Sequence, residues 1–242
     1  MKFSLVIPLY NESLNVERIK MEVPSALDKI AQIEEYEIIC IDDCSTDDTL
    51  VKLKAIKNPV FNVYKLEKKG GQSAAIAAGI RKCSYEIIGL IDADLQTSPH
   101  DFEKLIFTLL EGYDCVTGCR KKRNDNLNKR ISTTIARNIR QWFLKDSFYD
   151  ITAPLKVFKK ECMAGFTFYD TFHRFIPLLI QMQGYKVVEI DIDHFPRTAG
   201  ESKYGIRNRL WPGITSMFAI KWMLKSYLAI DVEKGDRKWN NG

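Results

Sequence analysis

Short apolar runs alternate with segments of helical pattern along most of this chain of 242 residues. Runs rich in Val, Ile, Leu and aromatic residues, bounded by polar residues, are typical of strands. They occur at residues 3–9, 36–41, 60–66, 86–91, 114–117, 155–158 and 185–192. Helices are predicted between or after them, at residues 13–30, 74–82, 99–111, 131–143, 173–183 and 210–230. Strands that alternate with helices indicate an α/β fold, with a mostly parallel, Rossmann-like sheet flanked by helices.

The strand at residues 86–91 is followed by the most informative polar pattern of the sequence. Asp92, Asp94 and Gln96 come directly after it and alternate with apolar residues. At this spacing, side chains can point the same way, and ligands of open α/β sheets bind at the carboxyl ends of strands. Hard oxygen ligands of this kind suit Mg²⁺ or Mn²⁺, which can be shared with substrate phosphates. A solvated turn that ends the strand is the alternative interpretation.

Two earlier strand ends carry groups suited to a nucleotide. Pro8, Tyr10 and Glu12 end or follow the first strand, and Asp42 and Asp43 follow the second. Loops at the carboxyl ends of parallel strands line one crevice, so we expect these residues to lie near the third loop. An aromatic ring can stack on a base, and carboxylates can accept its N–H groups.

The glycine pair Gly70 and Gly71 precedes an alanine-rich helix. Glycine allows close backbone approach to a ligand at a helix N-terminus. The sequence contains neither G-x-G-x-x-G nor a P-loop motif, which disfavours a dinucleotide site and a P-loop NTPase.

Composition places the chain among ordinary globular proteins, with 45% apolar residues and a net charge of only +5. The first apolar run contains Pro8 and is too short for a signal peptide, and no stretch is apolar enough to span a bilayer. The six cysteines lack C-x-x-C spacing, which indicates reduced thiols in the cytoplasm rather than zinc ligands.

Two later segments have distinctive charge and hydropathy. Residues 119–130 are strongly basic, which is suited to an anionic partner but also to a solvated charged surface. Residues 210–230 are almost wholly apolar apart from Thr215, Ser216, Lys221 and Lys225. This segment predicts an amphipathic appendage that lies in a membrane interface, packs on its own domain or contacts another subunit.

Several motifs together resemble the inverting family 2 glycosyltransferases, whose nucleotide-sugar-binding fold is called GT-A. They are SLVIPLYNES, IDDCSTDDT and LIDADLQTSP. The motifs VTGCR, HRFIPLL and HFPRTAGESKYG are similar to those of the branch that uses polyprenyl phosphates, which includes dolichyl-phosphate mannose synthase. The resemblance covers about residues 2–210 and implies a GT-A domain at residues 1–209, with an amphipathic helix and tail at 210–242.

The resemblance also implies roles for individual residues. Asp92, Asp94 and Gln96 match the metal and donor-diphosphate positions. The implied nucleotide and donor-site residues are Pro8, Tyr10, Glu12, Asp42, Asp43 and Gly71. The acceptor phosphate is expected at Arg120, Arg130 and Ser132, and a loop that closes over the donor at Arg197, Ser202 and Lys203. Asp94, Arg120 and Arg130 are the residues expected to act most directly in catalysis.

The implied reaction moves one sugar from a nucleoside diphosphate sugar to a polyprenyl phosphate, with Mg²⁺ or Mn²⁺ as cofactor. The sequence lacks the Glu-Asp base motif and the Q-x-x-R-W motif of other family 2 enzymes. A phosphate monoester explains this difference, because it is already anionic near neutral pH and needs no base.

Three functional hypotheses remain open on the sequence alone. The favoured one is a cytoplasmic enzyme peripheral to the cytoplasmic face of a membrane, with no nucleic-acid partner and possible self-association. The second is a family 2 transferase that acts on a soluble or cell-surface glycan. The third is a catalytically idle nucleotide-binding scaffold, which the complete set of Asp92, Asp94 and Gln96 argues against.

Overall fold

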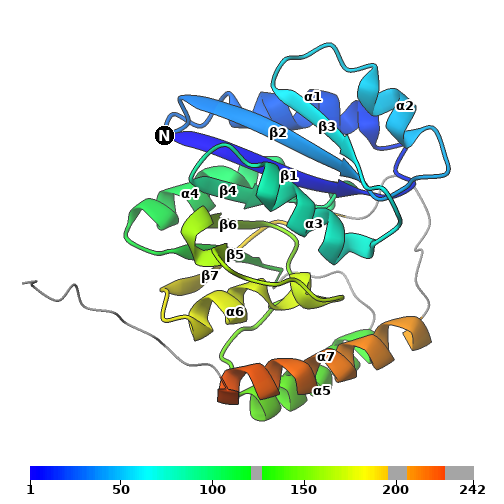
Figure 1. Cartoon of the computed structure of the whole chain (residues 1–242). Coiled ribbons are helices and arrows are strands. Elements are labelled where there is room, and N and C mark those ends of the chain that lie inside the picture. The colour runs from blue at the N-terminus through cyan, green and yellow to red at the C-terminus, as the bar shows by residue number, and fades with distance from the viewer. Residues whose placement is uncertain (121–126, 196–205, 227–242) are drawn as a thin grey trace, which may run out of the picture.

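A computed structural model describes residues 1–120, 127–195 and 206–226, with side chains at 1–120, 133–195 and 214–226. Its centre is a seven-stranded sheet with the strand order β3-β2-β1-β4-β6-β5-β7 (Figure 1). The strands are β1 (Lys2–Leu9), β2 (Glu35–Asp42), β3 (Phe61–Lys65), β4 (Ile87–Leu90), β5 (Cys115–Cys119), β6 (Lys156–Lys159) and β7 (Val187–Asp191). All the pairings are parallel except those of β6, so the predicted mostly parallel α/β sheet is confirmed.

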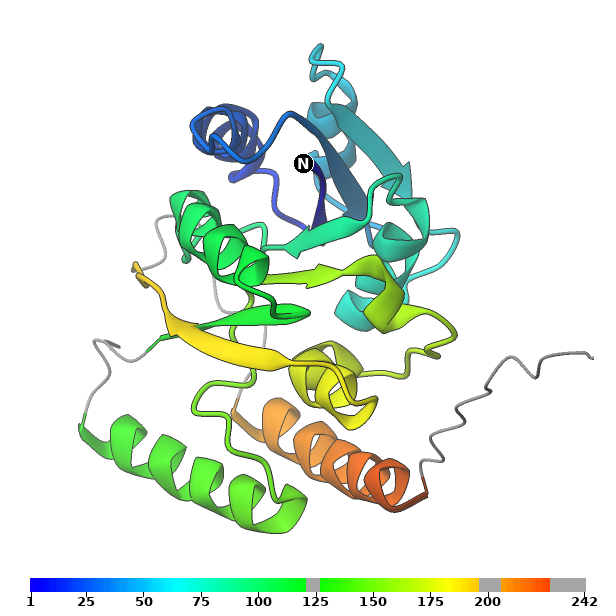
Figure 2. The ribbon, with the colours of Figure 1, turned by 90° about the vertical axis from the view of Figure 1, so that its left-hand side faces the viewer.

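Helices cover both faces of the sheet. They are α1 (Val16–Leu27), α2 (Thr49–Lys54), α3 (Gly71–Lys82), α4 (Phe102–Leu110), α5 (Leu127–Leu144), α6 (Ile176–Met182) and α7 (Ile206–Ser226). Figure 2 shows α1 and α4 on one face and α3 and α6 on the other. Strand β1 is buried on both faces, because Leu5 packs with the α1 and α4 side while Val6 packs with the α3 and α6 side. A strand covered on both faces needs the unbroken apolar run that the sequence shows.

Two local predictions were wrong. The first helix, expected over residues 13–30, begins only at Val16 with Asn15 at its N-cap, and the Ser13 N–H donates to Asp47. The short helix α2 was not predicted, because its six residues are too few to show a clear helical period.

Strand β6 runs against its neighbours β4 and β5. The register pairs Lys156, its first residue, with Leu90 at the end of β4 and with Thr117 of β5. Because the strand is reversed, its beginning lies at the edge where the parallel strands end. The sequence predicted this strand but not its direction, and the reversal brings Lys156 to the edge expected to bind ligands.

Helices α5 and α7 lie side by side at the end of the molecule farthest from β3 (Figures 1 and 2). The rings of Phe143 and Phe218 meet edge to face with centroids 5.0 Å apart. Ile220 of α7 is fully buried in an apolar cluster with residues such as Phe172 and Leu179. One face of α7 therefore packs on the rest of the chain. The helix begins at Ile206 and includes the proposed domain boundary at 209/210, which stays a prediction.

Each of these two helices also has an exposed apolar stripe. The exposed residues are Ile135, Ile139 and Trp142 of α5 and Ile214, Phe218 and Trp222 of α7. We call these six residues the apolar stripes. Within the residues that the structure describes, no helix is both long and apolar enough to cross a membrane.

Candidate active site

The loops after β1, β2 and β4 meet at one edge of the sheet, as predicted. These three strands are neighbours and run parallel, so their carboxyl ends coincide. The first loop is fixed to the second by hydrogen bonds from the Asn11 N–H to Ser45 Oγ, over 2.9 Å, and from the Glu12 N–H to Thr49 Oγ1, over 2.8 Å. Helix α1 is tied to the third loop by Arg18, whose Nη1 donates to the carbonyl of Asp94 over 3.4 Å. The edge is therefore a connected unit.

The third loop has the alternation expected of a metal-binding segment. Asp92, Asp94 and Gln96 are partly exposed, whereas Ala93 and Leu95 between them are buried. Desolvation, and next the neighbouring Asp94 carboxylate, raise the pKa of Asp92 to about 6. Two crowded carboxylates favour a bound cation, which relieves their mutual repulsion.

The oxygen atoms of Asp92, Asp94 and Gln96 suit a divalent cation whose coordination shell is completed by a substrate. Among the described residues, no three His, Cys, Asp or Glu side chains lie close enough together to hold a metal ion. Two carboxylates and the amide of Gln96 would therefore need substrate phosphate oxygens or water to complete the coordination shell. Such shared coordination is usual for Mg²⁺ and is also open to Mn²⁺.

The two aspartates at the end of β2 have different environments. Asp42 is fully buried; its Oδ2 accepts the Ser45 N–H, and its Oδ1 has no hydrogen-bond partner among the described residues. Asp43 accepts the N–H groups of Gly70 and Gly71 over 2.6 Å and 2.9 Å. Gly71 has a φ of +78°, a conformation that favours glycine, so this pair fixes the start of α3. Asp42 therefore has one buried oxygen without a partner in the described part of the chain, whereas both oxygens of Asp43 are engaged.

The aromatic ring proposed to stack on a base already has a cation over it. The Lys69 ammonium lies 3.8 Å from the centroid of the Tyr10 ring, a cation–π contact. Glu12 accepts a 2.6 Å hydrogen bond from Asn15 at the start of α1. These contacts tie the loop after β1 to the start of α1 through Glu12 and to the segment before α3 through Tyr10.

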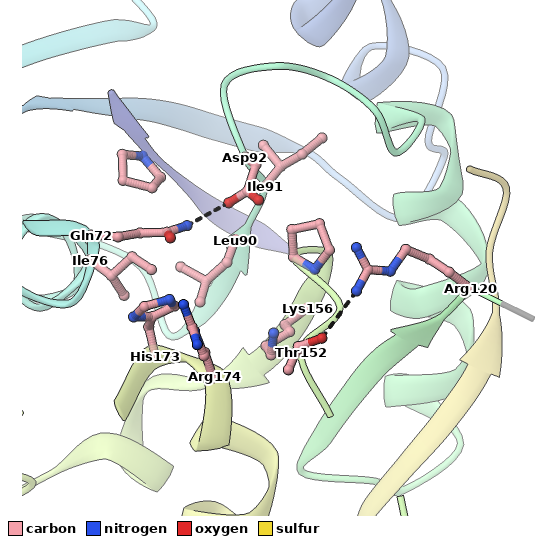
Figure 3. Close-up of a pocket in the computed structure, with 12 residues that line it drawn as sticks. Gln72, Ile76, Leu90, Ile91, Asp92, Arg120, Thr152, Lys156, His173 and Arg174 are labelled. Carbon is pink, nitrogen blue, oxygen red and sulfur yellow. Dashed lines mark hydrogen bonds between the residues drawn. The ribbon is translucent and has the colours of Figure 1, made fainter. Parts of the chain in front are cut away.

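A cavity of about 310 Å³ opens beside the metal-binding segment (Figure 3). Predicted residues on its wall include Pro8, Asp92 and Arg120. The other lining residues are Gln72, Ile76, Leu90, Ile91, Thr152, Pro154, Lys156, His173 and Arg174. The cavity therefore joins residues expected at the donor and acceptor sides of one site.

Arg120 is held in a fixed orientation. Its Nε and Nη2 donate to the two carboxylate oxygens of Asp150 over 2.6 Å and 3.0 Å, and Nη2 also reaches Thr152 Oγ1 at 3.2 Å. Hydrogen bonding to Asp150 raises the pKa of Arg120 despite its desolvation. A bidentate pair of this kind fixes the guanidinium plane.

His173 is a poor proton acceptor at this position. Its Nδ1 lies 2.7 Å from Ser73 Oγ, which also accepts the backbone N–H of His173. Desolvation lowers the pKa of His173 to about 3, with smaller contributions from Arg174 and Lys156. The imidazole is therefore neutral and too weakly basic to serve as an effective general base near neutral pH.

Five predicted site residues lie outside the described side chains: Arg130, Ser132, Arg197, Ser202 and Lys203. Conversely, the sequence analysis did not predict Asp150, Lys156 and Arg174 as site residues. A single lysine within the apolar segment 155–158 was the available signal for Lys156, since buried strands rarely contain unpaired charges. No sequence signal linked Asp150 to Arg120.

Comparison with known proteins places this geometry in a family. The sequence profile described as "Glycosyl transferase family 2" matches residues 4–171. The chain belongs to glycosyl transferase family 2. This family 2 chain is also similar to curated proteins named undecaprenyl-phosphate 4-deoxy-4-formamido-L-arabinose transferase. That of Aeromonas hydrophila subsp. hydrophila is 28% identical and that of Photorhabdus laumondii subsp. laumondii 30% identical, each over 206 residues. The matches cover 84% of the family 2 chain but only 63% of each relative's length.

Solved structures share the fold of this family 2 chain. The mannosyltransferase PcManGT from Pyrobaculum calidifontis, in complex with GDP-Man and Mn²⁺, has a TM-score of 0.65 at 17% identity, covering 94% of this chain and 65% of that one. Glucosyl-3-phosphoglycerate synthase from Mycobacterium tuberculosis, with Mn²⁺ and UDP-glucose, has a TM-score of 0.58 at 16% identity, covering 93% and 76%. The expected GT-A fold is confirmed.

Proposed function

We propose that this protein transfers one sugar from a nucleoside diphosphate sugar to a polyprenyl phosphate at a membrane surface. The observation that most directly supports this proposal is the set of residues that line the cavity. Arg120, Lys156 and Arg174 supply three cations, and Asp92, which belongs to the metal-binding segment, is the one carboxylate among the described lining residues. Such a lining suits an anionic acceptor, and the curated relatives are named for transfer to undecaprenyl phosphate.

The same lining disfavours a hydroxyl acceptor, because a hydroxyl group needs a base to remove its proton. Asp92 is assigned to the metal, and the pKa of His173 is too low for this task. An acceptor phosphate is already anionic and needs only to be held in line with the donor sugar. In this proposal Arg120 binds the acceptor phosphate, while Asp42 and Tyr10 contact the donor base.

We propose that Asp92, Asp94 and Gln96 hold a divalent metal ion, Mg²⁺ or Mn²⁺. Bound there, such an ion stabilises the negative charge that develops on the departing nucleoside diphosphate. Structural relatives with Mn²⁺ and a nucleotide sugar support this assignment. The chain itself supplies the oxygen ligands and the Gln72 amide, which donates to Asp92 over 2.8 Å.

The membrane part of the proposal rests on the apolar stripes. Trp142 is 79% exposed and Trp222 is 69% exposed, on two helices that lie side by side. Tryptophan favours the interface between water and lipid, and Lys225, near the end of α7, suits contact with anionic headgroups. A polyprenyl acceptor keeps its tail in the bilayer, so the enzyme must work at that surface.

The deciding experiment incubates the full chain with GDP- or UDP-sugars and Mn²⁺. One reaction contains a polyprenyl phosphate in vesicles as the acceptor, and the other contains a soluble sugar. We expect release of nucleoside diphosphate and formation of a glycolipid only with the polyprenyl phosphate. Transfer to the soluble sugar, with none to the lipid, would establish the glycan-acceptor alternative instead.

A further inference from the structure

Lys156 is a buried cation that forms no ion pair among the described residues, although Asp92 and Asp150 lie near enough to oppose the lowering of its pKa by desolvation. Only 3% of this residue is exposed. Its ammonium donates to the carbonyl of Ala153. Two largely buried arginines are different, because Arg120 is paired with Asp150 and Arg140 with Asp146. An ammonium withdrawn from water without a paired carboxylate destabilises the folded state, so its presence calls for a functional explanation.

The position of Lys156 connects this charge to the cavity. The reversed strand β6 places its first residue between Leu90 of β4 and Thr117 of β5, at the carboxyl edge of the sheet. Figure 3 shows Lys156 and Arg174 below the cavity and Asp92 above it. Its ammonium has three donors, and one of them goes to Ala153. The remaining donors are available to a group in the cavity.

We infer that Lys156 is a direct ligand of the acceptor's phosphate group and that Arg174 is a further cation of the same subsite, beside Arg120. This inference rests on the proposed function and adds two residues to it. A phosphate monoester carries a charge of about −1.5 to −2 near pH 7, so a single cation does not neutralise it. In the proposed function, Asp92 and Asp94 would hold the metal ion that binds the donor's diphosphate, and Asp92 lies across the cavity from Lys156 (Figure 3).

Other evidence favours the acceptor over the donor as the ligand. Arg120 follows β5 directly, and Lys156 lies beside that strand, so both cations come from the half of the sheet that lacks the nucleotide loops. Desolvation lowers the pKa of Lys156 to about 8 even though Asp92 raises it. An anionic ligand would stabilise the charged form of this lysine.

The test compares binding of two probes to the full chain by calorimetry. One probe is a short-chain isoprenyl phosphate, and the other is GDP or UDP with Mn²⁺. Lys156→Met removes the charge at similar length, and Lys156→Arg keeps it. Lys159→Met is the matched control, because Lys159 lies at the other end of β6, outside the cavity, and is paired with Asp114.

We expect Lys156→Met to weaken binding of the isoprenyl phosphate by about 10-fold or more, as for a lost hydrogen bond to a charged group. Nucleotide binding should stay within about twofold, Lys156→Arg should recover most of the affinity, and Lys159→Met should leave it unchanged. The thermal midpoint of unliganded Lys156→Met should equal or exceed that of the wild type. A merely structural role would lower that midpoint instead.

Three results overturn the inference: unchanged isoprenyl phosphate binding by Lys156→Met, an equal loss of nucleotide binding, or a lowered thermal midpoint with both ligands lost. The test needs no turnover, so it is separate from the proposed function. A wild-type protein that binds isoprenyl phosphate through Lys156 but transfers no sugar contradicts the proposed function alone. Transfer that is insensitive to Lys156→Met contradicts the inference alone.

Discussion

The side-chain amide of Gln72 donates a 2.8 Å hydrogen bond to Oδ1 of Asp92. Gln72 is in the first turn of α3, whose start is fixed by the hydrogen bonds of Asp43 to Gly70 and Gly71. The end of β2 thus orients, through a helix, a carboxylate that follows β4. Outer partners of this kind hold metal ligands in place before the ion arrives.

Gln72→Leu should therefore weaken metal binding without removing a ligand. We expect the Mn²⁺ concentration for half-maximal activity to rise about 10- to 100-fold, the usual effect of losing an outer partner. Saturating Mn²⁺ should restore much of the rate. A rate that stays low at saturation would show that Gln72 acts on the substrate and not through Asp92.

Removing a metal ligand should have a larger effect. Asp94→Ala should abolish turnover while the circular dichroism spectrum is retained, because the side chain is partly exposed beyond the end of a strand. EDTA should abolish wild-type activity, and Mn²⁺ should restore it. Glu103→Gln, an exposed acid on α4, is the control and should leave activity unchanged. Full activity of Asp94→Ala in EDTA would disprove the metal role.

Arg120→Ala should raise the KM for the lipid acceptor by a factor equivalent to about 1.5–3 kcal/mol, with the donor KM unchanged. It should also lower stability, because the buried Asp150 loses the guanidinium, although the backbone N–H of residue 120 and the Thr152 hydroxyl still donate to it. Arg140→Ala separates the two effects, since it breaks the comparable pair with Asp146 away from the cavity. The Arg140→Ala variant should be less stable, but its KM values for acceptor and donor should not change. A matching rise in the donor KM for Arg120→Ala would place this arginine in the donor subsite.

Membrane association should depend on the exposed tryptophans and not on α7 as a whole. Deleting α7 would uncover the apolar cluster around Ile220, so point substitutions are the cleaner test. Trp142→Ser with Trp222→Ser should abolish flotation with anionic vesicles, because each change removes on the order of 2 kcal/mol of apolar burial. Phe107→Ser on α4, which is 57% exposed in the wild type, should float normally. Flotation of the double variant would exclude the apolar stripes as the contact surface.

The buried lysine predicts an unusual pH dependence of stability. Because the pKa of Lys156 is lowered from 10.5 to about 8, the unfolded chain binds more protons than the folded protein between these two values. Deprotonation of this group should therefore raise the free energy of unfolding by on the order of 3 kcal/mol as the pH rises from about 8 to 10.5. Lys156→Met should lack this contribution. Urea unfolding at pH 7 to 10.5 measures it, and identical slopes for the two proteins would refute it.

The sequence was most informative where pattern and chemistry agree. The alternation of Asp92, Asp94 and Gln96 with apolar residues matches the alternating exposure of that segment. The convergence of the loops after β1, β2 and β4 followed from parallel strands alone. Here local pattern determines which way the side chains point.

The remaining features depend on contacts between distant segments. The reversal of β6 leaves no mark in four residues, yet it decides that Lys156 and not Lys159 reaches the site. The pair of Asp43 with Gly70 and Gly71, and that of Arg120 with Asp150, each join residues about 30 positions apart. Both require the folded sheet, so the sequence identified the residues but not their partners.

The strand order has a consequence for how such enzymes change over evolutionary time. Strands β1 to β4 form one side of the sheet, and β5 to β7 form the other. The proposed nucleotide loops and metal-binding segment therefore precede α4 in the chain, and Arg120, Lys156 and Arg174 follow it. A recombination event within α4 would exchange one set while leaving the other intact. Under the proposed function, such an exchange of gene segments would change the acceptor while preserving donor preference.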